Sequence, residues 1–121
     1  MSDQQRVRVH LETAGYATTF GGAYSATFAV EDERTQVVWV DVAAELTLAS
    51  PIVDGIDGAL PEWLVGQDFG RYTLAAHPPF ATVGLSLPLT VSEELFDREA
   101  ALLAQYADAW EKALTPDSDL L

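Results

Sequence analysis

A chain of 121 residues with 19 acidic and 6 basic side chains has a formal net charge of −13 at pH 7. A field of this sign repels nucleic acid phosphates and anionic lipid headgroups, so we expect no nucleic acid and no membrane among the partners. The absence of cysteine excludes disulfides, thiolate metal sites and cysteine nucleophiles. Length and a hydrophobic content of 49% predict a single domain over residues 1–121.

The first residues, MSDQQRVRV, lack the apolar segment of a signal peptide, and no later run approaches the ~20 apolar residues of a membrane-spanning helix. We therefore expect the protein in the cytoplasm. The acidity has two explanations: a cationic protein partner, or a surface that serves only solubility. The second is the simpler explanation.

The first segment, DQQRVRVHLETAGY, is compatible with two structures. Val7, Leu11 and Ala14 share one helical stripe, and Gly15 stands where a helix commonly passes into a left-handed cap. The alternation in RVRVHLE is also typical of a strand. The LETAGY ending favours a short helix over residues 4–14.

The next two segments predict a hairpin of strands. AYSATFAV alternates apolar and small polar residues, and TQVVWVDVAAEL is rich in β-branched and aromatic residues, with the polar turn EDERT between them. ASPIVDGIDG follows with one proline and two Asp-Gly steps, which indicate a long loop at residues 49–58. ALPEWLVGQDF then predicts one or two helical turns.

GRYTLAA and ATVGLSLPL predict a second pair of strands, joined by the stiff connector AHPPF. SEELFDREAALLAQYADAWEKAL is the clearest helix, because Ser92 can cap it and apolar residues recur at steps of three and four. The expected apolar stripe consists of Leu95, Leu102, Leu103, Tyr106, Trp110, Ala113 and Leu114. TPDSDLL, residues 115–121, predicts a flexible acidic tail.

These elements predict an α+β fold: an antiparallel sheet of about four to five strands, with the long carboxy-terminal helix packed on one face. Alternation in TQVVWVDV separates two faces of the central strand. The natural core face carries Val38, Val40 and Val42, and the other carries Val37, Trp39 and Asp41. Small neighbours are expected around Trp39 on that second face, namely Thr27, Ala29, Thr73, Gly84 and Ser86.

Trp39 is the first candidate for a protein-binding residue, because tryptophan is enriched among the residues that dominate interface energies. Val37 and Asp41 beside it, and Trp63 on the short helix, are the other candidates. The alternative is that the first helix or the 44–70 connection covers Trp39 and makes it part of the core. Trp63 has a similar alternative as the packing residue of its helix.

Catalytic and metal-binding patterns are missing from the sequence. His10 and His77 lack ligand spacing, and DGIDG lacks the ligand pattern of a calcium loop, so Asp54 and Asp57 are taken as turn residues. We expect most carboxylates in turns or on the polar face of the last helix, where desolvation would not tune a general acid. The sequence therefore predicts no enzyme, no catalytic residue, no metal and no cofactor.

The predicted elements follow the order helix, two strands, a connection with a short helix, two strands, long helix. The segments that carry this order are LETAGY, YSATFAVEDERTQVVWV and TVGLSLPLTVSEELFDREAALLAQYADAWEKAL. In this order the chain resembles YbjN-like and type III secretion chaperone-like domains over nearly its whole length. The resemblance implies an antiparallel α+β domain that usually pairs as a homodimer and binds polypeptide without cofactor or ATP. It implies no catalytic residue. The acidity is similar to that of many secretion chaperones.

The sequence thus predicts a non-enzymatic protein-binding module, chaperone-like or adaptor-like, that binds a partner polypeptide and forms a homodimer. Three alternatives remain open. They are an immunity or inhibitor protein for a basic toxin or nuclease, a structural subunit of a phage or other multi-protein particle, and a small enzyme that uses some of the carboxylates.

Overall fold

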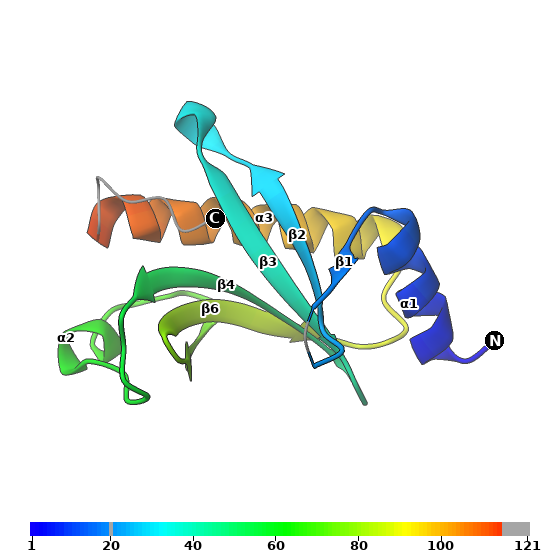
Figure 1. Cartoon of the computed structure of the whole chain (residues 1–121), viewed down its shortest axis with the longest axis horizontal. Helices are drawn as coiled ribbons and strands as arrows, with labels where there is room; N and C mark the ends of the chain where they lie inside the picture. The colour runs from blue at the N-terminus through cyan, green and yellow to red at the C-terminus, as the bar shows by residue number, and fades with distance from the viewer. Residues whose placement is uncertain (20, 115–121) are drawn as a thin grey trace.

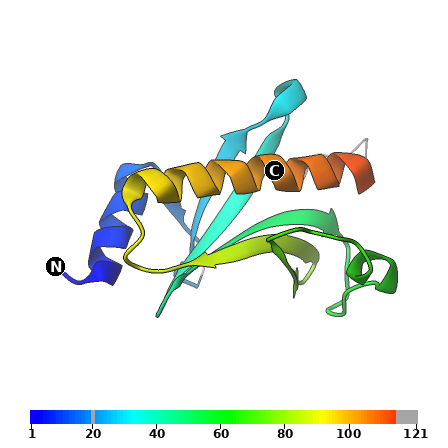
Figure 2. The same cartoon turned by 180° about the vertical axis from the view of Figure 1, so that it is seen from behind.

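The computed structural model describes residues 1–19 and 21–114, and it consists of one antiparallel sheet with a long helix on one face (Figure 1). The six strands have the order β1-β2-β3-β4-β6-β5. Helix α3 (Glu93–Leu114) crosses the sheet, and α1 (Asp3–Thr13) packs beside its first turns (Figure 2). The α+β class and the packing of the long helix are confirmed, with more strands than the four to five expected. The acidic tail predicted at residues 115–121 lies outside the described residues.

The chain forms the sheet in two stretches separated by a connection. Before the connection come β1 (Ala17–Thr18), β2 (Tyr24–Ala29), the 3-10 turn η1 (Glu31–Glu33), β3 (Thr35–Val42) and β4 (Leu46–Asp54). The connection carries the short helix α2 (Glu62–Val65), and the hairpin of β5 (Thr73–His77) and β6 (Phe80–Leu87) follows. Both predicted hairpins and the short helix are confirmed. No helix in the described ranges is long and apolar enough to cross a membrane.

The ambiguous first segment is a helix. Ser2 forms a capping box with Gln5: the Ser2 hydroxyl accepts from the Gln5 backbone N–H, and the Gln5 side chain accepts from the Ser2 N–H. Val7 and Leu11 are buried, as a helical stripe requires, whereas Val9 between them is 49% exposed. Gly15 follows the helix at a φ of +90°. The stripe and the cap therefore outweigh the strand-like alternation.

Strand β4 corrects the loop expected at residues 49–58. Leu48 and Ile52 are fully buried, and β4 pairs with β3 on one side and β6 on the other. Pro51, which lacks an N–H, lies next to an irregularity in the β4–β6 register, where the ladder is interrupted. The Gln36 side-chain amide donates to the Pro51 carbonyl. Burial between two strands thus overrides the turn signals until Asp54.

The core lies between α3 and the valine face of β3. Val38 and Val40 are fully buried, and Val42 is nearly so, which confirms the predicted core face. Helix α3 covers these valines with a stripe that differs from the expected one, because Leu102 is 41% exposed. The apolar residues that α3 buries are Phe96, Leu103 and three alanines, Ala100, Ala104 and Ala107. Small alanines let the helix lie close to the sheet.

Carboxylates of α3 also point into the protein. Glu99, Asp108 and Glu111 are buried, so the expectation that helix carboxylates lie on the polar face is wrong for these three. Asp108 and Glu111 accept from Arg34 at 2.7 and 2.8 Å, and Glu99 accepts from Arg71 at 2.5 Å. Each buried negative charge therefore faces a guanidinium, as burial of a charge requires.

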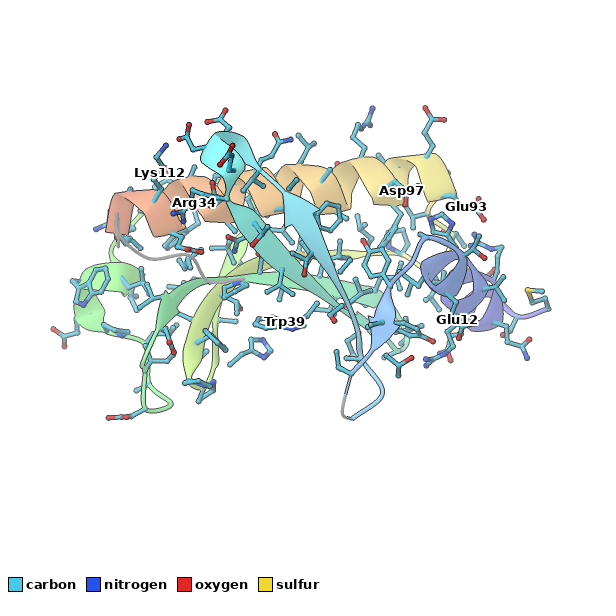
Figure 3. The ribbon with its side chains drawn as sticks, turned by 45° about the horizontal axis from the view of Figure 1, so that its top comes forward. Glu12, Arg34, Trp39, Glu93, Asp97 and Lys112 are labelled. Atoms are coloured by element: carbon cyan, nitrogen blue, oxygen red, sulfur yellow. The ribbon has the colours of Figure 1, made fainter. Side chains whose placement is uncertain are left out.

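Arg34 belongs to the β2–β3 hairpin, which extends past α3 (Figures 1 and 3). Asp32, at the tip of this hairpin, accepts a hydrogen bond from Lys112 in the last turn of α3. This hydrogen bond holds the pKa of the Asp32 carboxyl below its usual range and raises the pKa of Lys112. The hairpin tip is therefore fixed to the last turns of α3 by an exposed ion pair next to the buried Arg34 cluster.

Tyr16, in the connection between α1 and β1, provides a pH-dependent test of the packing of this connection against α3. Burial, together with the negative charge of Asp97, raises the pKa of the Tyr16 phenol well above its ordinary value of 10.0. As the pH rises above about 10, the unfolded chain loses this proton first, so the folded state loses relative stability. We expect phenolate absorbance to show a late titration step that Tyr16→Phe removes. A titration curve that Tyr16→Phe changes only near pH 10 would contradict this.

Candidate functional site

The candidate site is the face of the sheet opposite α3. Figure 3 shows Trp39 on the side of the sheet away from the helix. The strand register aligns Trp39 with Ser25 of β2 on one side and Ala49 of β4 on the other, and Ala49 with Gly84 of β6. Trp39 is thus the large side chain in a row of small ones. The small side chains leave a shallow surface on the sheet, which is called the floor below, and the Trp39 ring projects from it.

A hollow of about 490 Å³ lies on this face beside Trp39. Its floor comes from β3 and β4, and its wall is the β5–β6 turn. The Trp39 and Phe80 rings pack against each other in its lining, with centroids 5.6 Å apart and a tilt of 46°. The lining consists of Ala23, Trp39, Val40, Asp41, Thr47, Ala49, His77, Pro78, Pro79 and Phe80. The hollow is therefore predominantly apolar, with polar groups at its margin.

A second, shallower hollow of about 150 Å³ continues across β4, β6 and β5. It shares Thr47, Ala49 and His77 with the first, so the two form one continuous groove. Gly84 lies in its floor, and a Cβ at this position would stand 2.0 Å from the Leu48 carbonyl oxygen. Only glycine lets β6 approach β4 this closely, and the floor of the groove depends on that approach.

The groove has few ionisable groups. Asp41 and His77 are the ionisable side chains in its lining, and neither lysine nor arginine is among the described lining residues. Within residues 1–19 and 21–114 no group of three or more His, Asp or Glu side chains could hold a metal ion. What the groove can do chemically is bind an apolar group near a carboxylate.

The structure brings together three of the four predicted site residues. Val37, Trp39 and Asp41 lie on the open face, and Trp39 is half-buried. Trp63 lies on α2, outside the lining of the groove, and is 53% exposed. What contacts Trp39 from the side is Phe80 of the β5–β6 turn.

Several lining residues were not predicted as site residues. Pro78, Pro79 and Phe80 belong to AHPPF, whose stiffness was recognised but whose position over β3 was not. Thr47 and Ala49 were missed because their segment was not predicted to pair as the strand β4. The alternation of β4 was the available signal: Leu46 and Leu48 are buried, and Thr47 between them is exposed.

A second polar cluster joins α1 to α3. His10 Nε2 lies 2.8 Å from the Asp97 carboxylate, and His10 Nδ1 lies 3.7 Å from the Glu93 carboxylate. Figure 3 labels Asp97 and Glu93. The His10 ring also meets Phe96 edge-on. Sequence spacing gave no sign of this cluster, because His10 and Asp97 are 87 positions apart. Its contacts hold the two helices together.

The fold and this groove define an α+β protein with an open sheet face. We compared the chain with family models, with curated proteins and with solved structures, and none of these comparisons found a match.

Proposed function

We propose that the protein is a non-enzymatic protein-binding module, chaperone-like or adaptor-like, that takes a segment of a partner polypeptide onto the open face of its sheet. The observation that carries the proposal is the Trp39–Phe80 hollow, which opens onto a floor of small side chains. None of the described residues that line it belongs to a helix, and Figure 2 shows the long helix α3 running along one side of the sheet.

A polypeptide segment fits this surface better than a compact small molecule. The groove runs from the hollow across three strands, so an extended chain can place one side chain in the hollow against the Trp39 and Phe80 rings and lay its neighbours along the floor. The proposal also draws on the resemblance of the sequence to secretion chaperone-like domains; the observed order differs from the expected one in having four strands, β1 to β4, before the short helix. The fold supplies rigid strands as the platform.

Self-association is the second part of the proposal. Strand β5 pairs only with β6 among the described strands and leaves one edge for another strand. Trp63 and Val65 on α2 are both more than half exposed, at 53% and 58%. These features suit a homodimer, and light scattering of the purified protein measures whether its mass is that of two chains.

Removing the Trp39 side chain is expected to abolish most of the polypeptide binding. A displayed library of random peptides, selected on the purified protein, supplies ligands whose affinity is then measured by fluorescence anisotropy. Truncation of a dominant aromatic residue costs about 2 kcal/mol or more, so Trp39→Ala should weaken binding about 30-fold. Thr47→Lys, at an exposed position of the floor, should obstruct the same ligands without removing the ring.

Leu102→Ala is the control, because it removes an exposed apolar side chain of α3 that lies outside the lining of the groove. Circular dichroism and thermal unfolding establish that each variant folds. A selection that enriches no peptide, or peptides that bind Trp39→Ala and Thr47→Lys as tightly as the original protein, would overturn the proposal.

An inhibitor of a basic protein is the second candidate function, favoured by the net charge of −13. Its affinity would come from exposed carboxylates and would fall steeply with added salt, whereas binding in the Trp39 hollow is much less sensitive to salt. A ligand lost in salt and indifferent to Trp39→Ala would favour the inhibitor.

A further inference from the structure

We propose that the hollow beside Trp39 selects a cationic side chain, a lysine or arginine that the partner segment carries among apolar or small residues. The inference rests on the proposed function and names the chemistry of the group that the hollow binds. The stem of the cationic side chain would lie against the apolar wall that the packed Trp39 and Phe80 rings form together, and its charged end would meet Asp41.

The arrangement of Trp39 and Asp41 suits such a side chain. They stand two positions apart on β3 and point to the same face, which separates them by roughly 7 Å along the strand. The packed indole and Phe80 rings form one apolar wall, and the carboxylate lies at the margin of the same hollow. Lysine and arginine have an apolar stem and a charged end in this order.

The described chain supplies no cation of its own to this place. Asp41 is exposed and makes no ion pair with any residue of the ranges 1–19 and 21–114. Three of the chain's five guanidiniums have partners elsewhere: Arg8 lies over the Tyr24 ring, Arg71 over the Tyr72 ring, and Arg34 in its carboxylate cluster. Indole attracts cations more strongly than the rings of tyrosine or phenylalanine. In the described ranges no cationic side chain lies over the Trp39 ring.

The charges around the hollow favour a cation over a neutral apolar group. A purely apolar occupant would approach the Asp41 carboxylate without compensating it, and an acidic occupant would be repelled by it. The net charge of −13 adds a field that draws basic segments toward the surface. An exposed contact with an aromatic face together with an exposed ion pair should give about tenfold tighter binding than a neutral side chain of the same shape.

Matched peptides test this directly. The probes are acetylated, amidated peptides Ser-Val-Ser-X-Ser-Val-Ser in which X is arginine, citrulline or glutamate, since citrulline has the shape of arginine without its charge. They are titrated into the full ¹⁵N-labelled chain while the indole N–H signals are followed by NMR, with the Trp39 signal assigned from Trp39→Phe. We expect the arginine peptide to shift the Trp39 signal and to bind about tenfold tighter than citrulline, with glutamate weakest.

Asp41→Asn should bring the arginine peptide to about the affinity of the citrulline peptide and leave the citrulline affinity unchanged. Asp57→Asn, which neutralises an exposed carboxylate outside the groove, is the matched control and should change neither. Equal binding of the arginine and citrulline peptides, an undiminished preference in Asp41→Asn, or no shift of the Trp39 signal with any probe would overturn the inference.

The two proposals fail in different ways. If library-selected peptides still depend on Trp39 but carry no excess of lysine or arginine, the protein-binding function stands and the cationic preference is wrong. If neither selected peptides nor probes depend on Trp39, the protein-binding function itself is wrong.

Discussion

Replacing Arg34 with methionine is expected to destabilise the protein by roughly 3–5 kcal/mol, because it leaves buried carboxylates without their cation. The side chains of Asp108 and Glu111 are only 6% and 0% exposed, and Arg34 is their guanidinium partner. Urea unfolding should show the loss as a lower midpoint at an unchanged slope.

Arg98→Met is the matched control, since Arg98 is exposed on α3, the helix that carries Asp108 and Glu111. Its replacement should change the free energy of unfolding by no more than about 0.5 kcal/mol. A second variant separates the loss of packing from the unpaired charges. Arg34→Met combined with Asp108→Leu and Glu111→Met removes the whole cluster and should recover most of the stability, because the penalty lies in uncompensated charge. Equal stability of Arg34→Met and Arg98→Met would show that the cluster contributes little.

Local patterns predicted the elements whose signals lie within a few residues. The period of two in TQVVWVDV placed Val38 and Val40 in the core, and both are fully buried. The three-and-four spacing predicted α3 to within a residue of its observed start. These patterns succeed because each residue's face follows directly from the geometry of its own element.

Signals that depend on distant partners were missed. Pro51 and the Asp-Gly steps indicated a loop, but the segment up to Asp54 is a strand because β3 and β6 flank it and bury it on both sides. The buried pairing of Arg34 with Asp108 spans 74 positions and has no local signature. In each case tertiary packing overrides what the local sequence favours.

The candidate site was predicted in part for the same reason. Alternation alone places Val37, Trp39 and Asp41 on one face, whereas Phe80 reaches Trp39 only because the β5–β6 turn curls back over that face. The β5–β6 turn lies some 40 positions after Trp39 in the sequence. Its contribution to the hollow cannot be inferred before the strand order is known. The hollow is thus a property of the topology, although its main residue was visible in the sequence.

Gly84→Ala is expected to destabilise the protein by about 1–3 kcal/mol or more, although it adds only one methyl group. The added Cβ would lie 2.0 Å from the Leu48 carbonyl oxygen and 3.2 Å from the Ala49 Cα. Both atoms belong to the backbone of the central strand β4, so no side chain can rotate away, and β4 and β6 must separate. Thermal unfolding should show the loss directly as a lower midpoint.

Gly66→Ala is the matched control, because its added Cβ would meet nothing closer than 3.9 Å and its φ of −77° suits alanine. Gly84 also lies in the groove floor beside Ala49, so the separation of β4 and β6 should reach the hollow. At temperatures where the Gly84→Ala variant remains folded, we therefore expect it to bind the Trp39-dependent peptides with lower affinity than the original protein. Unchanged stability would mean that the strands part at little cost, and unchanged binding in a destabilised variant would confine peptide recognition to the hollow beside Trp39.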